Sequence, residues 1–201
     1  MLAASISPGV AIGCIVAAYL IGTFPTALLV GRRRGVDPTR VGSGNPGATN
    51  MARTAGRAAG TVTLVGDLLK GVVAAGIGWA AAGRDLAAWC GLAAVVGHTL
   101  PLTRGFRGGK GVATAAGMAL VVAPAAAVLA AVAFGLTVAA SRTVSLGSVV
   151  GAAVMPPAAA ALGAPTPVVV SLAGCALLIA TRHWGNLRRL ARGEERRLGS
   201  H

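Results

Sequence analysis

A run of glycine and small polar residues, Gly42-Ser43-Gly44-Asn45-Pro46-Gly47-Ala48-Thr49-Asn50, is followed closely by Arg53. Its three glycines let the backbone approach a ligand closely, and its polar side chains offer neutral hydrogen-bond donors. Arg53 adds a guanidinium that can form paired hydrogen bonds with a phosphate. The same composition is typical of a turn-rich loop between helices. The density of donors beside an arginine favours phosphate binding. The candidate residues are Ser43, Gly44, Asn45, Gly47, Asn50 and Arg53.

A second glycine-rich segment, GFRGGKGVAT, runs from Gly105 to Thr114 and opens an apolar stretch. Backbone amides of such a turn at a helix N-terminus form an anion site, and a lysine within the turn adds a point charge. The nucleotide-binding pattern G-x-x-x-x-G-K-[ST] does not fit, because Gly111 follows the lysine and no glycine stands in the first position. A basic loop at a membrane surface would explain the arginines of this segment but not a lysine among glycines. The candidate residues are Gly108, Gly109, Lys110 and Gly111.

Asp67 and Lys70 stand three residues apart within an apolar stretch, where charges are costly unless they are paired or face a polar cavity. A structural ion pair and a role toward a substrate are equally consistent with this spacing. Ser145 and Ser148 lie at the expected start of a helix, where capping is the ordinary explanation for hydroxyl side chains.

His183 and Asn186 are also three residues apart, so they share one helical face just beyond the last apolar stretch. With the other polar segments on the same side of the membrane, they indicate a polar site at that surface. Cys14, Cys90 and Cys175 stand singly in apolar stretches, and we interpret them as packing residues. No cluster with metal-ligand spacing is recognisable, and we expect neither a metal nor another cofactor.

The composition indicates which kind of protein positions these residues. The 201 residues are 55% hydrophobic and only 11% charged, with a mean hydropathy of +0.74. A typical soluble domain has about 25% charged residues. These values indicate a multi-pass membrane protein, and they exclude a disordered chain, a disulfide scaffold and a polar nucleic-acid-binding domain. We expect one membrane-embedded domain, residues 1–201, with no soluble domain attached.

We predict an all-α fold with seven membrane helices, some of them short or incomplete; five or six helices are the alternative. Pro124 cannot donate a hydrogen bond inside a helix, so it should break the long apolar stretch around it. The predicted spans are 9–31, 60–83, 86–102, 111–123, 125–140, 146–162 and 167–181.

The net charge of +13 is distributed asymmetrically over the segments between these spans. One side of the predicted membrane receives only Arg84. By the positive-inside rule, the opposite side is cytoplasmic, the C-terminus is inside and the N-terminus is outside. Nucleic acid is not needed to explain the basic residues. The cytoplasmic segments carry Arg32, Arg33, Arg34, Arg40, Arg53, Arg57, Arg104, Arg107, Lys110, Arg142 and the arginines from Arg182 to Arg197.

Taken in order, these motifs resemble the acyl-phosphate:glycerol-3-phosphate acyltransferase family (PlsY) of bacterial phospholipid synthesis. The resemblance extends from about Tyr19 to Glu194, and the ordered set is highly specific. Pro46 and Trp184-Gly185 depart slightly from the family pattern. The matching residues are GSGNPGATN with Arg53, GDLLKG, Gly97-His98 with Pro101, FRGGKGVAT, the serines of SLGS, and His183 and Asn186 with Gly193-Glu194.

The resemblance implies a membrane enzyme that moves a fatty acyl group from acyl phosphate to the sn-1 hydroxyl of glycerol 3-phosphate. It implies a bacterial cell-membrane location, a cytoplasmic active site, and neither a cofactor nor an obligate protein partner. It leaves open whether His183 or a substrate phosphate accepts the proton. The implied catalytic residues are Lys110, Ser148, His183 and Asn186, and the supporting ones are Asp67, Lys70, His98, Ser145 and Glu194.

Two functions of other classes compete with this one. A small transporter for a phosphate-bearing solute would also use charges within the membrane, but its polar residues should reach the midplane, often within an inverted repeat. A regulatory membrane subunit would leave the loops around Ser43 and Lys110 without a purpose.

Overall fold

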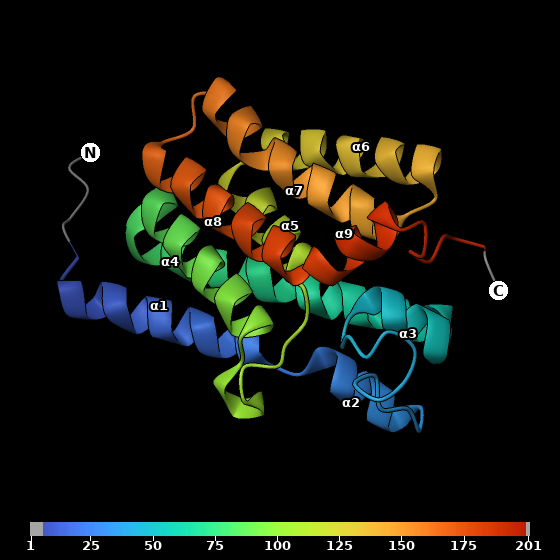
Figure 1. Ribbon diagram of the computed structural model, residues 1–201. Helices are drawn as coiled ribbons and strands as arrows, with labels where there is room; N and C mark the ends of the chain where they lie inside the picture. Colours follow the sequence, from blue (N-terminus) through green and yellow to red (C-terminus); the bar gives the residue numbers. More distant parts are fainter. Residues whose placement is uncertain (1–5, 200–201) are drawn as a thin grey trace.

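The computed structural model describes residues 6–199, and in this part of the chain the elements are helices connected by loops, with no strand (Figure 1). The all-α prediction is confirmed. The helices are α1 (Pro8–Thr23), α2 (Thr26–Arg33), α3 (Ala48–Thr54), α4 (Arg57–Thr99), a short 3₁₀ helix (Leu102–Arg104), α5 (Val112–Val122), α6 (Pro124–Ser141), α7 (Val144–Ala161), α8 (Thr166–Arg182) and α9 (Trp184–Ala191).

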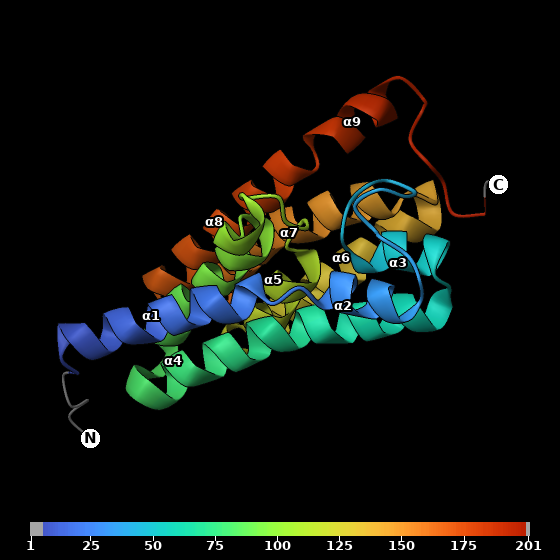
Figure 2. The same cartoon turned by 90° about the horizontal axis from the view of Figure 1, so that it is seen from below.

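Helix α4 is interrupted by non-helical backbone at Ala82 and Gly83 and folds back on itself (Figures 1 and 2). Gly83 has a φ of +75°, a left-handed conformation that glycine adopts without a steric penalty. The returning half packs closely, because a Cβ on Gly78 would lie 2.6 Å from the Leu86 carbonyl oxygen. The two halves therefore correspond to the predicted spans 60–83 and 86–102.

Prolines follow the ends of α1 and α5, and the sequence predicted only the break at Pro124. Helix α5 ends at Val122 and α6 begins at Pro124, as predicted. The prediction of an unbroken helix over 9–31 is wrong, because α1 ends at Thr23 and Pro25 precedes α2. The Pro25 ring removes a backbone donor and disfavours helical geometry in the residue before it.

By length and hydropathy, four helical segments of residues 6–199 are sufficient to cross a membrane, or five if α8 and α9, bent by 55°, form one span. This count takes α1 with α2 as one segment and the whole of α4 as another. Helix α5, with 11 residues, is too short to span alone. The chain is a membrane protein, and seven crossings remain a prediction.

Small residues allow the helices around α4 to pack so closely that their backbones are in contact. A Cβ on Gly71 would collide with the Thr114 carbonyl oxygen of α5, and one on Gly117 would collide with the Leu68 carbonyl oxygen of α4. Such contacts replace the hydrophobic driving force that lipid does not provide. They hold the N-terminus of α5, which follows Lys110, beside the middle of the first half of α4.

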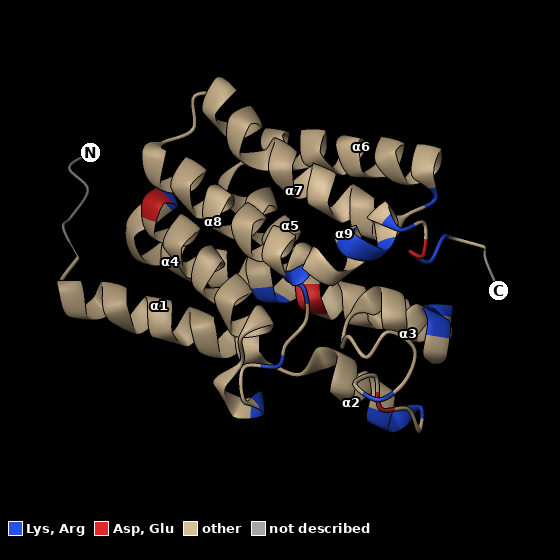
Figure 3. Ribbon diagram, in the orientation of Figure 1, with Lys and Arg blue, Asp and Glu red and all other residues tan. Residues whose placement is uncertain are grey.

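The charged residues are separated along the molecule (Figure 3). Blue segments gather at the end that carries α2, α3 and α9, whereas the turn within α4 carries one blue and one red segment at the other end. Arg84 and Asp85 directly follow this turn.

Candidate functional site

A cavity of about 380 Å³ lies among α3, α4, α5, α6, α7 and the α8–α9 corner. Its lining combines charged and polar residues from seven segments of the chain with alanine, leucine, valine and methionine side chains. A ligand with an anionic head and an apolar body suits such a lining. The polar lining residues are Ser43, Asn45, Thr49, Asn50, Arg53, Asp67, His98, Lys110, Ser145, Ser148, His183, Asn186, Glu195 and Arg196.

Lys110 is the ammonium group of this site. It precedes α5 and donates a hydrogen bond of 2.5 Å from Nζ to Oδ1 of Asn186. Burial lowers the Lys110 pKa to about 8; Glu195 opposes this shift, while Arg189, Arg182 and Arg53 reinforce it. An anionic ligand would relieve this repulsion, so the site is electrostatically prepared for phosphate.

The first turn of α5 supplies the backbone donors of the site. Gly111 has a φ of +83° and stands at the N-cap, and Val112 and Ala113 follow it in the cavity wall. The first amides of a helix have no acceptor within that helix and carry partial positive charge. Beside Lys110, they make this end of the cavity suited to an anion.

Gly108 and Gly109, two of the predicted phosphate ligands, do not line the cavity. The Gly109 amide donates to the His98 carbonyl oxygen at 3.1 Å. The carbonyl oxygens of Gly108 and Gly109 accept bonds from Arg182 of 2.8 and 3.2 Å. A Cβ on either glycine would collide with His98. Both glycines therefore fix the loop that carries Lys110.

His183 occupies the corner between α8 and α9, and its residue is 2% exposed. Nδ1 lies 2.8 Å from the Ile179 carbonyl oxygen. Because a carbonyl can only accept, Nδ1 carries the proton and Nε2 of the neutral ring is an acceptor. Burial, and then the cation of Lys110, lower the His183 pKa to about 4. The ring is therefore neutral near pH 7.

Glu195, the neighbour of the predicted supporting residue Glu194, is the centre of a hydrogen-bond network. Its Oε1 accepts from Ser145 Oγ at 2.9 Å and from Asn186 Nδ2 at 2.6 Å. Its Oε2 accepts from Arg189 Nε at 2.9 Å. Burial would raise the Glu195 pKa, but these hydrogen bonds outweigh it and the pKa is lowered. Glu194 is exposed and lies outside the cavity lining.

The two serines of α7 do not cap the helix, so the capping explanation is not the one that the structure supports. The N-cap is Thr143, whose side chain makes no cap hydrogen bond. Ser145 reaches Glu195, and Ser148 donates from Oγ to the Val144 carbonyl oxygen at 2.9 Å. Both serines line the cavity, and the Ser148 oxygen keeps its capacity to accept.

Asn50 holds the first polar loop in shape and uses both ends of its amide to do so. Oδ1 accepts from the Ser43 amide at 2.9 Å, and Nδ2 donates to the carbonyl oxygens of Pro38 and Val41 at 2.9 and 3.1 Å. Asn50 also lines the cavity, so its role as a phosphate ligand stays a prediction beside this positioning role.

Of the other predicted residues of this loop, three reach the cavity and one does not. Ser43, Asn45 and Gly47 line it, whereas Gly44 is exposed and lies outside the lining. Arg53 lines the cavity from α3 and is exposed at its edge.

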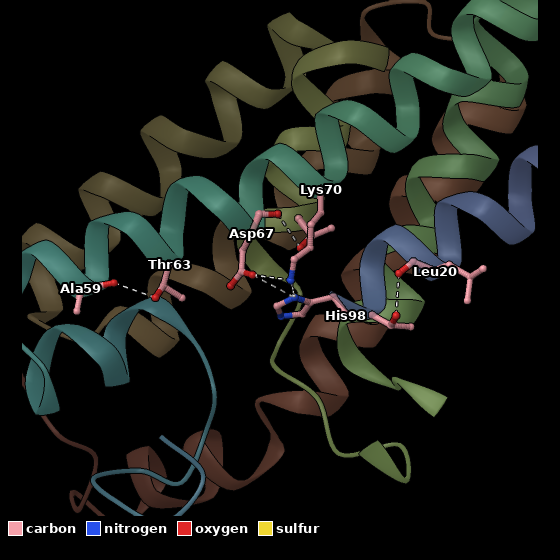
Figure 4. Close-up of polar contacts among 8 residues, drawn as sticks. Leu20, Ala59, Thr63, Asp67, Lys70 and His98 are labelled. Atoms are coloured by element: carbon pink, nitrogen blue, oxygen red, sulfur yellow. Dashed lines mark hydrogen bonds and ion pairs between the residues drawn. The ribbon is translucent and has the colours of Figure 1, made fainter. Parts of the chain in front are cut away.

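Asp67, Lys70 and His98 form a buried charged cluster beside the cavity (Figure 4). Lys70 Nζ lies 2.7 Å from Asp67 Oδ1 and 3.4 Å from His98 Nδ1. Asp67 and His98 line the cavity, but Lys70 does not. Lys70 is thus the structural partner of Asp67, and the cluster ties the two halves of α4 together beneath the site. The Asp67 carbonyl oxygen also accepts from Thr114 Oγ1 of α5 at 2.9 Å.

Together, fold and site define a class of protein: a membrane protein with a cavity that joins basic and polar groups to an apolar wall. Known proteins specify the class further. A family model described as glycerol-3-phosphate acyltransferase matches residues 12–193. A glycerol-3-phosphate acyltransferase of Pseudomonas aeruginosa is 49% identical over 183 residues, with 89% of this chain and 95% of the relative covered. One of Trichlorobacter lovleyi is 42% identical over 182 residues, with 90% and 94% covered.

Solved structures agree with these relatives. The crystal structure of PlsY (YgiH), described as an integral membrane glycerol 3-phosphate acyltransferase in its glycerol 3-phosphate form, superposes with a TM-score of 0.91 at 36% identity, covering 95% of this chain and 96% of that one. Its lysophosphatidic acid form gives 0.90 at 35% identity with the same coverage. The chain belongs to the glycerol-3-phosphate acyltransferase family, which confirms the resemblance and makes it a membrane acyltransferase.

Proposed function

We propose that the enzyme transfers a fatty acyl group from acyl phosphate to the sn-1 hydroxyl of glycerol 3-phosphate. The products are 1-acylglycerol 3-phosphate (lysophosphatidic acid) and inorganic phosphate. The observation that carries this proposal is the single cavity in which the Lys110–α5 anion site is continuous with an apolar wall. Both substrates contain phosphate, and the donor also contains a long apolar chain.

In the proposed reaction, the glycerol hydroxyl oxygen attacks the acyl carbonyl carbon, and the bond between that carbon and the phosphate oxygen breaks. The hydroxyl proton passes to the departing phosphate, so no protein nucleophile is required. Lys110 and the first amides of α5 stabilise the developing negative charge. Binding both substrates in one cavity supplies much of the acceleration through orientation.

His183 orients the acceptor in this scheme. Its unprotonated Nε2 accepts a hydrogen bond from a glycerol hydroxyl, and its low pKa makes it a weak base near neutral pH. This favours the substrate phosphate as the proton acceptor. Ser43, Arg53 and Ser148 are proposed phosphate ligands, and Asn186 orients glycerol 3-phosphate beside Lys110.

The test of the proposed function is a donor comparison. Purified enzyme receives glycerol 3-phosphate with acyl phosphate, acyl-CoA or acyl-carrier protein, and the products are separated by mass and by position of acylation. We expect 1-acylglycerol 3-phosphate from acyl phosphate alone. Equal rates with a thioester donor, or acylation at the sn-2 hydroxyl, would contradict the proposal.

A transporter is not favoured, because the family is one of acyltransferases.

We also propose a bacterial cell-membrane location with the basic end, and hence the active site, facing the cytoplasm. In a variant without native cysteines, cysteine introduced at Arg40 should react with a membrane-impermeant thiol reagent only after cells are opened. Cysteine at Asp85 should react in intact cells. Both positions are exposed, so accessibility to solvent does not distinguish them. The opposite labelling pattern would reverse the orientation.

The lowered pKa of Lys110 predicts a loss of activity in mild alkali. Below about pH 8 the group is cationic and binds phosphate; above it, the free enzyme loses this charge. We expect kcat/KM for glycerol 3-phosphate to fall as pH rises through about 8, because this ratio reports the free enzyme. The variant Lys110→Arg should lack this decline at any activity it retains, since arginine stays charged. An unchanged alkaline decline in that variant would assign the titration to another group.

A further inference from the structure

The apolar part of the cavity runs between α6 and α7. Among the lining residues of these two helices, Ala127 on α6 and Met155 on α7 lie furthest along the chain from the α6–α7 loop, and the α7 end at this loop carries the polar lining residues Ser145 and Ser148. Met155 is seven positions beyond Ser148 on α7, which places it about 10 Å deeper at ~1.5 Å per residue. We name Ala127 and Met155 the channel floor.

Helix packing places the two floor residues at a common level. A Cβ on Gly151 of α7 would lie 3.0 Å from the Ala130 carbonyl oxygen and 3.2 Å from Phe134 Cβ of α6. The two helices are antiparallel neighbours in both views (Figures 1 and 2). One turn beyond Gly151 is Met155, and about one turn before Ala130 is Ala127. Both residues are therefore at the same depth.

Met155 is the one long side chain of the floor. It is 5% exposed and packs in the main apolar core with Ala159, Val168 and Leu172. Ala127 is 8% exposed, and the α7 residues between Ser148 and the floor that line the channel are Gly151 and Ala152. The length of the Met155 side chain, which is flexible and unbranched, thus sets the depth of the channel.

We propose that Met155, opposed by Ala127, determines the length of the acyl chain that the enzyme prefers. This inference rests on the proposed function, because it places the donor's acyl chain in the apolar channel with its reactive end beside Lys110. A chain that ends at the floor fits the channel without displacing a side chain. A longer chain must displace Met155 or bend toward the lipid-exposed edge at Leu64, whose residue is 46% exposed.

The experiment measures kcat/KM for a series of saturated acyl phosphates that differ by two carbons. Met155→Ala should shift the preferred chain to greater length, and Ala127→Leu should shift it to shorter length. The readout is the chain length that gives the highest kcat/KM, because a methylene group that moves from lipid into an apolar channel gains little free energy and the discrimination comes from the fit at the floor. Met155→Leu and Ala153→Leu are the controls, because the first nearly conserves volume and the second is exposed on α7 outside the lining.

The inference is overturned if folded Met155→Ala retains the wild-type length profile, or loses rate equally for all lengths. It is also overturned if Ala153→Leu moves the profile as much as Met155→Ala does. If the enzyme uses a thioester donor instead, the proposed donor is wrong. The same length series attached to that thioester then tests Met155 independently. Since Met155→Ala only removes atoms, the test does not depend on accommodating Leu at position 127.

Discussion

Replacing Lys110 by alanine is expected to lower kcat/KM for acyl transfer by about 100-fold or more. Mutations of single groups that stabilise a developing anion cost about this much in other enzymes. Lys110 bonds to Asn186, lines the cavity and stands next to the free amides at the start of α5. Its loss removes the ammonium nearest to these amides. Rates at saturating and limiting glycerol 3-phosphate, with equal amounts of folded enzyme, are the measurement.

Arg107→Ala is the matched control, because Arg107 belongs to the same loop and is exposed outside the cavity lining. It should retain most of the activity. Lys110→Arg should restore little, since the planar guanidinium differs in shape from the ammonium that the loop holds against Asn186. If Arg107→Ala lost activity while Lys110→Ala kept it, the loop would still be basic, but its functional charge would be Arg107.

The helices were predictable because apolar stretches and their interruptions are local features of the sequence. Pro124 ended a helix as expected, and the glycine at position 83 marks the turn between the halves of α4. Pro25 shows where hydropathy fails to locate a helix end. The apolar stretch continues past this proline, so hydropathy alone predicted one helix. The bend between α8 and α9 likewise leaves the apolar pattern intact until the arginines begin.

Most of the residues that line the site were predictable, but which of them contact a ligand and which hold a loop in place was not. Motifs identify polar residues that work together, and most of those chosen line one cavity. Whether a residue contacts ligand or holds a loop depends on partners distant in sequence. Asn50 bonds to residues 12 and 9 positions earlier, and Gly109 bonds across to His98. Such pairings have no periodic signal, so the sequence did not separate binding residues from positioning residues.

Glu195→Ala is expected to lower kcat/KM by about tenfold to a hundredfold and to reduce thermal stability. Three side-chain donors, from Ser145, Asn186 and Arg189, lose their acceptor. Leaving a buried donor unpaired costs about 1–3 kcal/mol. Because Asn186 also accepts from Lys110, releasing its Nδ2 loosens the ammonium, and small displacements of catalytic groups cost about 100-fold in rate. Glu195→Gln should have a smaller effect, since it keeps an acceptor for Ser145 and Asn186.

The matched control is the same pair of substitutions at the neighbouring residue, Glu194. Glu194→Ala and Glu194→Gln make identical chemical changes in an exposed side chain outside the cavity, so activity and melting temperature should stay close to wild type. The readout is kcat/KM together with thermal unfolding in detergent, for all four variants purified in parallel. If the Glu194 variants lost activity and the Glu195 variants did not, the network around Asn186 would be irrelevant to catalysis. A loss of stability without a change in kcat/KM at Glu195 would limit its role to holding the C-terminal segment against α7.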